Sequence, residues 1–324
     1  MNPEFDISIV ISSYNRDDKV LQTIERLFES DLNDFNKMEL IVIDDGSPIP
    51  VKEILPKLKD IPGKIDLKLI TQENSGIGAT RNRGFREANA EIIVFLDDDI
   101  LLKKNTLKDI FEAQQEHEGA IIFGTYPFIS HSSESLYRFA SSFFGYDRIT
   151  TEKKIEKTNG ITSGLLSVNR TKLNGLENFY KDDLTIPAAE EHEIMFRFHK
   201  LGIPVFYARH IAAIHNHHLQ LGWLARQQYK YGLATAEAFI KNPEILELEK
   251  FAEWKKSFTS SGRKRPKGFF NFLLTSWVGR RSLFFSSGIL EKLFPRADHN
   301  FIFGLLVSAY FQAGYRDGLR RFSR

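Results

Sequence analysis

Short apolar runs alternate with segments of helical periodicity over the first hundred residues, and no other feature of the sequence constrains the fold as strongly. The run from Ile7 to Ile11 is rich in β-branched residues and ends in a polar turn, as a buried parallel strand does. In residues 18–30 the apolar side chains recur on one face of a helix. This alternation is typical of βαβ units, in which helices cover both faces of a parallel sheet. Further strands are predicted at 40–43, 67–70 and 92–96, and further helices at 51–59 and 78–89.

The alternation becomes less regular after residue 100. The stretch up to about residue 158 is rich in Ser, Phe and Tyr and is predicted to be irregular beyond residue 124. After His218 the chain is predicted to be helical and basic. Within this part, helices are predicted at 104–118 and 190–201, and strands at 120–124, 164–168 and 205–214.

The chain contains no cysteine, which excludes disulfide bonds and thiolate ligands, so a bound metal ion would need oxygen or imidazole ligands. Its 42% hydrophobic and 27% charged residues are those of an ordinary globular protein. The N-terminal apolar run is preceded by Glu4 and Asp6 and breaks at Ser12, so it lacks the form of a signal peptide. We therefore expect a cytoplasmic protein.

Polar residues follow three of the predicted strands directly. In parallel sheets, ligands bind beyond the carboxyl ends of the strands, so these residues are expected to open on one edge and to form a site. The three segments are Ser12-Ser13-Tyr14-Asn15-Arg16, Asp44-Asp45-Gly46-Ser47 and Asp97-Asp98-Asp99.

Three adjacent carboxylates at the end of the fourth strand repel one another and need a cationic partner. Hard divalent cations take oxygen ligands and commonly bridge carboxylates to substrate phosphates, so Mg²⁺ or Mn²⁺ is the natural candidate. The alternative is a solvated acidic turn without a ligand. The polar ends of the neighbouring strands favour the metal site.

Two further segments suit a nucleotide. Asp45 is placed to accept a hydrogen bond from the N–H of a pyrimidine ring, although Asp, Gly and Ser are also ordinary turn residues. The segment from Gly76 to Gly84 is a loop that enters a helix and carries two guanidinium groups, which suits phosphate. It is not a dinucleotide fingerprint, because Arg81 stands where that spacing requires glycine.

Taken in order, these segments resemble the motifs of the family-two inverting glycosyltransferases with the GT-A fold. The resemblance covers about residues 5–218 and rests on four motifs: Val10-Ile11-Ser12-Ser13-Tyr14-Asn15-Arg16, Ile43-Asp44-Asp45-Gly46-Ser47, Gly78-Ala79-Thr80-Arg81-Asn82-Arg83-Gly84 and Phe95-Leu96-Asp97-Asp98-Asp99. It implies an α/β, Rossmann-like and mostly parallel sheet flanked by helices. The glycosyltransferase domain is expected at 1–218, with a nucleotide-sugar half at 1–100 and an acceptor half at 101–218, followed by a helical, basic extension at 219–324.

The resemblance also implies roles for individual residues. Asp99 is expected to be the direct ligand of Mn²⁺ or Mg²⁺, and Asp97 or Asp98 to reach the ribose or the sugar. The remaining residues expected to contact the donor are Ser12, Tyr14, Asp45 and Arg81.

An inverting transfer needs a base that takes the proton of the acceptor hydroxyl. Glu190 and Glu191 resemble the family's acidic pair at the start of a helix, and both fall within about 60° of the apolar stripe of that helix, at roughly 100° per residue. The family usually has aspartate at the position of Glu191, which leaves the choice between the two open. Acidic residues also simply favour a helix N-terminus.

Histidines follow the strand that ends near residue 214. Similar enzymes place a histidine after this strand, near the metal ion and the diphosphate. His215 matches that position best and His217 lies close to it.

These features predict a metal-dependent transfer of a sugar from a nucleotide diphosphate sugar, expected to be UDP-linked, to a hydroxyl of a glycan or lipid-linked acceptor. Two alternatives are a phosphatase of the haloacid dehalogenase type and a non-catalytic protein that binds sugar nucleotides. The phosphatase motif normally lies on the first strand and continues to Thr or Val where this chain has Leu101.

The C-terminal third is strongly basic. Residues 216–324 hold 18 Lys+Arg against 8 Asp+Glu, a net +10, so the other 215 residues carry 2 − 10 = −8. Residues 257–324 alone hold 12 Lys+Arg against 3 Asp+Glu, a net +9, with 11 of the 28 phenylalanines. We expect this region to dock on an anionic membrane, peripherally and from the cytoplasmic side, and not to bind nucleic acid. The alternative is a helical bundle core or a homodimer interface.

Overall fold

The computed structural model describes residues 4–58, 60–146, 149–173, 176–181, 183–186, 188, 190–247, 275–293 and 299–323. The chain divides into two compact units. The first comprises segments 1–129, 148–182 and 197–217, and the second comprises 130–147, 183–196 and 218–324. The functional halves and domain boundaries expected from the sequence stay a prediction.

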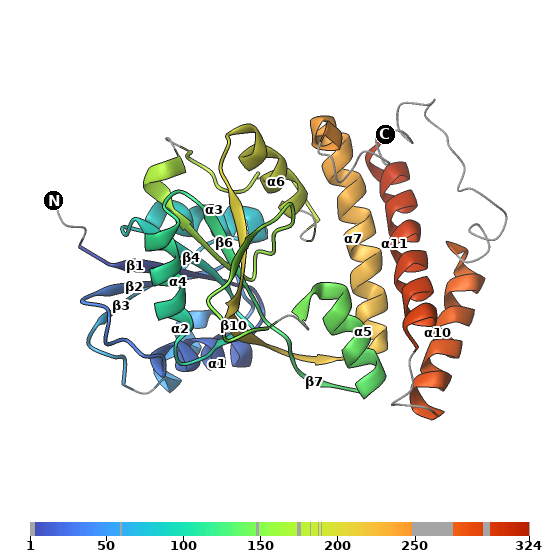
Figure 1. Cartoon of the computed structure of the whole chain (residues 1–324), viewed down its shortest axis with the longest axis horizontal. Helices are drawn as coiled ribbons and strands as arrows, with labels where there is room; N and C mark the ends of the chain where they lie inside the picture. The colour runs from blue at the N-terminus through green and yellow to red at the C-terminus, as the bar shows by residue number, and fades with distance from the viewer. Residues whose placement is uncertain are drawn as a thin grey trace. The chain divides into compact units, whose positions relative to one another are not determined.

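A mixed β-sheet forms the centre of the first unit (Figure 1). Its strand order is β3-β2-β1-β4-β9-β6-β10-β5, and the first four strands pair in parallel. β9 runs antiparallel between β4 and β6, while β6 and β10 pair in parallel. The strands of this path are β1 (Ile7–Ser13), β2 (Met38–Asp44), β3 (Ile65–Thr71), β4 (Ile92–Asp97), β5 (Ile100–Leu102), β6 (Ile121–Thr125), β9 (Leu165–Asn169) and β10 (Val205–Leu219).

The predicted βαβ alternation is confirmed in the first hundred residues. Every residue of β1 and β2 is buried, as expected for parallel strands covered on both faces. β3 lies at the end of the strand order and carries the half-exposed or exposed Asp66 and Lys68, as an edge strand does. The helices of this unit are α1 (Asp17–Phe28), α2 (Val51–Ile54), η1 (Leu55–Lys57), α3 (Ile77–Glu87), α4 (Thr106–Glu116) and η3 (Arg170–Leu173).

The prediction of an irregular stretch up to about residue 158 is wrong. A helix, α5 (Glu134–Phe144), begins where the hydroxyl of Ser133 accepts a hydrogen bond from the N–H of Leu136 and ends at Gly145 in the left-handed conformation. Leu136, Phe139 and Ala140 form its buried face, so a capping serine and an apolar stripe were present in a segment whose serines suggested a loop. Two short strands, β7 (Phe128–His131) and β8 (Ile155–Lys157), pair only with β10 among the described residues.

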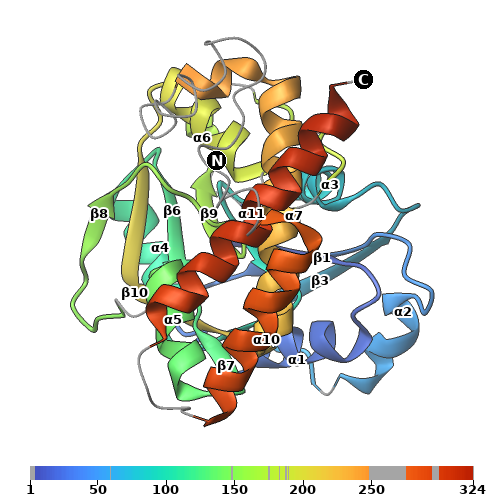
Figure 2. The ribbon, with the colours of Figure 1, turned by 90° about the vertical axis from the view of Figure 1, so that its right-hand side faces the viewer.

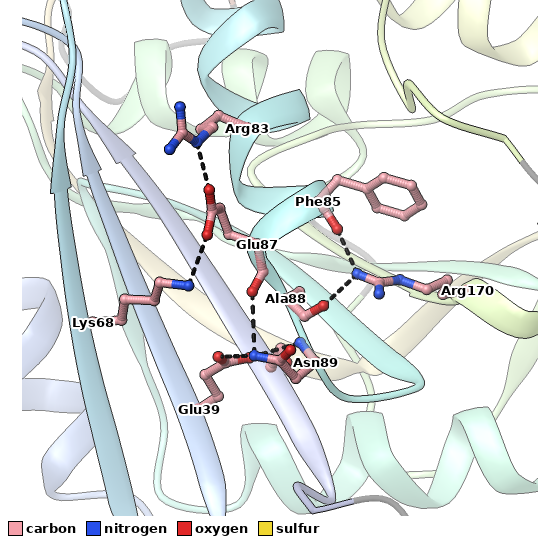
Figure 3. Close-up of polar contacts among 9 residues, drawn as sticks. Glu39, Lys68, Arg83, Phe85, Glu87, Ala88, Asn89 and Arg170 are labelled. Carbon is pink, nitrogen blue, oxygen red and sulfur yellow. Dashed lines mark hydrogen bonds and ion pairs between the residues drawn. The ribbon is translucent and has the colours of Figure 1, made fainter.

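The C-terminal end of α3 is anchored to the strands beneath it (Figure 3). The buried carboxylate of Glu39 on β2 accepts hydrogen bonds from the Ser8 hydroxyl and from both the backbone and side-chain N–H groups of Asn89. Arg170 donates to the carbonyl oxygens of Phe85 and Ala88, which the helix itself leaves unpaired. These contacts hold the end of α3 in place, and with it the helix that carries Arg81.

Long helices dominate the second unit. In both views α11 lies next to α7, and α10 lies on the outer side of the pair (Figures 1 and 2). The helices are α7 (Leu221–Lys241), α10 (Trp277–Leu293) and α11 (Asn300–Phe322), with η4 (Pro243–Glu247) after α7. Helix α6 (Glu190–Lys200) begins in the second unit and ends in the first.

The backbones of α7 and α11 approach each other through glycines. A Cβ at Gly232 would overlap the carbonyl oxygen of Phe311, and one at Gly314 would overlap that of Tyr229. Gly318 lies against Leu233 and Ala236 in the same way.

Of the described helices, none has the length together with the apolar character that crossing a lipid bilayer requires.

Replacing Gly314 by alanine is expected to lower the free energy of unfolding by at least about 2 kcal/mol, because the new Cβ forces the two backbones apart. Gly304→Ala on the same helix is the matched control, since nothing lies within 4 Å of a Cβ there. The control should be neutral or stabilise the protein by up to about 1 kcal/mol through helix propensity. Urea unfolding followed by circular dichroism measures both, and equal midpoints for the two variants would contradict close backbone packing.

Replacing Glu39 by alanine removes the acceptor of three hydrogen bonds, so we expect a loss of about 2 to 4 kcal/mol. The control is Glu29→Ala, because Glu29 is 62% exposed and pairs only with the exposed Arg26 among the described residues. That change should stay within about 0.5 kcal/mol. The same unfolding measurement separates them, and a Glu39 variant as stable as the control would show that the anchor is dispensable.

Candidate functional site

The carboxyl ends of β1, β2 and β4 meet at one edge of the sheet, as predicted. In the strand register Ser13 lies opposite Asp44, and Ser12 lies between Ile43 on one side and Asp97 on the other. The polar residues that follow the three strands are therefore neighbours in space.

Asp98 is held by groups from two elements. The Ser13 hydroxyl donates to its Oδ2 at 2.8 Å, and the Thr23 hydroxyl of α1 donates to its backbone carbonyl at 2.9 Å. Only 8% of Asp98 is exposed. Burial raises the pKa of this carboxyl to about 7, against the opposing effect of the nearby Arg16 charge.

Asp97 pairs with a buried arginine. Arg81 Nη2 lies 2.5 Å from Asp97 Oδ1, and the guanidinium stands 5.1 Å from the ring centroid of Tyr180. Arg81 was expected to contact nucleotide or phosphate, and the structure places it against Asp97. It orients that carboxylate from the first turns of α3.

Asp99 lies among three cationic or potentially cationic groups. Its Oδ2 is 2.8 Å from Arg16 Nη1, 3.5 Å from Lys19 Nζ and 3.5 Å from His215 Nε2. Burial alone would raise the pKa of Asp99, but His215, Arg16 and Lys19 together hold it well below its ordinary range. The Asp99 side chain is therefore a carboxylate at neutral pH.

Strand pairing explains why His215 reaches Asp99. The acidic turn continues into β5, which pairs antiparallel with β10 so that Ile100 lies opposite His215. The Asn216 N–H also donates to the Asp99 carbonyl at 2.7 Å. His217 lies one step further along the strand, with its ring 5.6 Å from that of His215, and burial lowers its pKa to about 4.

The Asp99 carboxylate and the His215 imidazole fit a divalent cation. Two ligands that bind one ion at about 2.1 Å lie about 3 to 4 Å apart, and the 3.5 Å between these two atoms is in that range. Oxygen and imidazole nitrogen are ligands that Mn²⁺ accepts, while Mg²⁺ favours the oxygen. Within the described ranges no cluster of three His, Asp or Glu residues can hold a metal ion, so substrate or water oxygens would complete the coordination.

Asp45 organises the loop before α3. Its Oδ1 accepts from the Gln72 amide and from the backbone and hydroxyl of Ser75, and its Oδ2 accepts from the Gly76 N–H at 2.9 Å. Oδ2 thus accepts one hydrogen bond within the described part of the chain and retains a lone pair. The neighbouring Asp44 is structural, because it accepts from the N–H groups of Ser47 and Val51.

Ser12 and Tyr14 are placed differently from each other. The Ser12 hydroxyl is buried and has no hydrogen-bond partner among the described residues, which is rare for a buried polar group and suits contact with a ligand. Tyr14 is 50% exposed at the turn that follows β1, where Asn15 adopts a positive φ of 53°. An exposed ring at this edge can stack on a base.

Glu190 and Glu191 begin α6 in the second unit, whereas the acidic turn belongs to the first. Glu190 is 8% exposed and Glu191 is half-buried. The segment before them is tied to α7, because the buried Glu237 carboxylate accepts from the backbone N–H groups of Thr185 and Ile186. The residues that lie together in the first unit are therefore Ser12, Asp97, Asp98, Asp99 and His215. The two glutamates belong to the second unit.

Sequence reasoning missed the residues of α1 that face the acidic turn. The sequence shows Arg16, the residue before α1, only as part of a motif, and it predicts no role for Lys19 or Thr23. Their spacing along the first turns of a helix that follows a polar strand end was the available signal. The meeting of α1 with β10, where Lys19 Nζ donates to the Asn216 carbonyl at 2.7 Å, is set by the fold.

Residues 8–174, about half of the chain, match the family model described as "Glycosyl transferase family 2". Poly(ribitol-phosphate) β-N-acetylglucosaminyltransferase TarP of Staphylococcus aureus (strain N315) is 28% identical over 120 residues, which are 37% of this chain and 36% of that protein. Glycosyltransferase GlyG of Streptococcus pneumoniae serotype 4 is 25% identical over 152 residues, 47% of this chain and 48% of that protein. The matches thus span less than half of either relative.

The fold is similar to that of the mannosyltransferase PcManGT from Pyrobaculum calidifontis, solved in complex with GDP-Man and Mn²⁺. The TM-score is 0.57 at 14% identity, over 96% of this chain and 88% of that one. The predicted α/β fold with C-terminal helices is confirmed by this likeness and by the sheet, which is parallel in its first half and mixed beyond it. The chain belongs to glycosyl transferase family 2 and has the GT-A fold.

Proposed function

We propose that this glycosyltransferase moves a sugar from a UDP-linked donor to a hydroxyl of a glycan or lipid-linked acceptor, with inversion at the anomeric carbon and with Mn²⁺ or Mg²⁺. The observation that carries the proposal is the Asp99 carboxylate, which lies beside His215, Arg16 and Lys19 at the shared edge of β1, β2 and β4. A carboxylate for a metal ion and side chains that can attract phosphate thus occur at one place.

The donor is assigned to the residues at this edge. Ser12 offers a buried hydroxyl that no described residue pairs with, Tyr14 an exposed ring for the base, and Asp45 a remaining acceptor for a pyrimidine N–H. We assign to Asp97 or Asp98 the contact with the ribose or sugar hydroxyls. Arg81 acts through Asp97, whose orientation it fixes.

Asp99 and His215 would hold the metal ion, which when bound stabilises the negative charge that develops on the leaving diphosphate. Arg16 and Lys19 add positive charge beside the same carboxylate and favour an anionic ligand there. Their contacts with Asp99 also keep the carboxylate in position.

Inversion requires a single displacement. The acceptor oxygen forms a bond to the anomeric carbon while the bond from that carbon to the diphosphate oxygen breaks, and the hydroxyl proton passes to a base. We assign the base to Glu191, with Glu190 as the alternative. Their place in the first turn of α6 supports this assignment, because the helix terminus stabilises a carboxylate.

The acceptor is assigned to the class of surface polymers and their lipid-linked precursors. The name of TarP, a poly(ribitol-phosphate) β-N-acetylglucosaminyltransferase, supports a polymer hydroxyl as the acceptor.

We further propose that the enzyme works in the cytoplasm, peripherally at the inner face of the membrane. Membership of glycosyl transferase family 2 argues against the haloacid dehalogenase-type phosphatase. Turnover of a UDP-sugar by the purified protein would exclude a protein that only binds sugar nucleotides.

Asp99→Asn is expected to weaken Mn²⁺-dependent UDP binding at least about tenfold, or about 1.4 kcal/mol, because the amide loses the charge that binds the ion. UDP affinity without metal should change little. Asp34→Asn, a surface aspartate paired with Lys108, is the control and should bind like the parent. Isothermal titration calorimetry with UDP, with and without Mn²⁺, makes the comparison. Full metal-dependent affinity in Asp99→Asn would remove Asp99 from the metal site.

Glu191→Gln is expected to lower the rate of sugar transfer by about 10² to 10⁴ while sparing UDP binding, as loss of a general base does. Glu190→Gln is measured beside it with the same donor and acceptor. If Glu190→Gln is the inactive variant, the two roles are exchanged. If both variants transfer sugar at the parental rate, the base lies elsewhere.

A further inference from the structure

Helix α10 presents a stripe of apolar side chains to solvent. Trp277, Phe285, Ile289 and Leu293 recur at multiples of four residues, and Val278 lies beside the first of them. Their exposed fractions are 63%, 61%, 56%, 65% and 65% in the order Trp277, Phe285, Ile289, Leu293 and Val278. We call these five residues the α10 stripe. Contiguous apolar patches on a protein surface usually mark an interaction site.

The stripe is not the face with which α10 packs in its own unit. Ser287 is fully buried and Glu291 is 9% exposed, so the packed face carries small and polar residues. A Cβ on Gly222 of α7 would lie 3.8 Å from the Phe284 ring, which shows where Phe284 contacts the neighbouring helix. Figure 2 shows α10 at the front of the helical group, beside α11. The large exposed side chains thus lie on the opposite face.

The charges of α10 are sorted by face. Its single carboxylate, Glu291, is turned inward and accepts a hydrogen bond from the Ser132 hydroxyl. Arg280 also points inward, because its guanidinium stands 5.9 Å from the ring centroid of Tyr229 on α7 and 5.7 Å from that of Tyr310 on α11. Arg281 and Lys292 are exposed, so the face of the stripe carries positive charge only.

An aromatic and a basic residue are paired at the start of the stripe. The Arg281 guanidinium stands 4.6 Å from the ring centroid of Trp277. Such a pair combines an apolar ring with a charge that can face phosphate, and amphipathic side chains of this kind gather at the boundary between lipid headgroups and acyl chains. The four-carbon stem of Lys292 allows the same placement at the other end.

We propose that the α10 stripe, with Arg281 and Lys292, docks the enzyme on an anionic phospholipid surface. The helix would lie in the plane of the headgroups, because its 17 residues and four charges do not suit a spanning segment. Apolar residues enter the outer part of the bilayer, and the two cations bind headgroup phosphate.

Charge decides between lipid and a second copy of the chain. Residues 257–324 carry 12 Lys+Arg and 3 Asp+Glu, so two copies that met through this region would bring like charges of +9 together. A soluble polyanion would satisfy the charges without needing exposed Trp, Phe, Ile and Leu side chains. An anionic membrane satisfies both kinds of residue.

The test is co-sedimentation of the full chain with vesicles of phosphatidylcholine, with and without phosphatidylglycerol, at low and high salt. Trp277→Ser/Phe285→Ser and Arg281→Glu/Lys292→Glu are each expected to lower the partition coefficient at least about tenfold on vesicles with phosphatidylglycerol. Ile61→Ser/Leu201→Ser and Lys52→Glu/Lys104→Glu are matched controls at exposed positions of the first unit, and should sediment like the parent. UDP binding should be the same in all five proteins, so the outcome is independent of the proposed reaction.

The proposal is overturned if the parent fails to sediment with anionic vesicles at low salt, or if the stripe variants sediment as the parent does. Sedimentation velocity is run on the same proteins in the absence of lipid. A parental dimer that the Trp277→Ser/Phe285→Ser change dissociates would assign the stripe to a second copy of the chain instead.

Discussion

Mutual repulsion of the carboxylates at the end of β4 is the constraint on which the first unit depends. A different set of partners offsets the repulsion at each aspartate. Asp97 pairs with Arg81, and the deeply buried Asp98 accepts a hydrogen bond from Ser13. Asp99 lies beside Arg16, Lys19 and His215. These partners come from α3, β1, α1 and β10. The edge of the sheet can hold three neighbouring acids only because all four elements converge there.

Contacts outside the acidic turn support this convergence. The end of α3 opposite to Arg81 is fixed by Glu39 and Arg170, and β5 fixes the register of β10 so that His215 lies beside Asp99. Asp45 fixes the loop through which the chain enters α3. Glu39 and Arg170, for which no contact with a donor is expected, therefore help to determine where the residues proposed to bind it lie.

The sequence allowed the prediction of what depends on local pattern and on the geometry of parallel strands. The burial of β1, β2 and β4 and the meeting of Ser12, Asp45 and Asp97 at one edge follow from that pattern. The approach of Arg16 and Lys19 to Asp99 does not, because it depends on how α1 packs. The choice between His215 and His217 depended on the pairing of β5 with β10, and a three-residue strand leaves no periodic signal.

The C-terminal region shows the same division. Its helical character was predicted from the sequence, and its positive charge and abundance of aromatic residues are evident there. Which aromatic residues face outward was not predicted, because the buried positions of α10 are polar and five of its large apolar residues are exposed, the reverse of the pattern expected for a packed helix. Only the packing of Ser287 and Glu291 against the rest of the unit distinguishes the two faces.

The glycines at the contact between α7 and α11 leave no space for a larger side chain there. The exposed positions of α10 have no such steric limit. The two features lie on different sides of the same helical group. Substitutions at the exposed positions of α10 can therefore change the surface of this unit without disturbing the close contact of α7 and α11 at Gly232, Gly314 and Gly318. The surface chemistry of the helical unit and the packing inside it can thus be altered independently of each other.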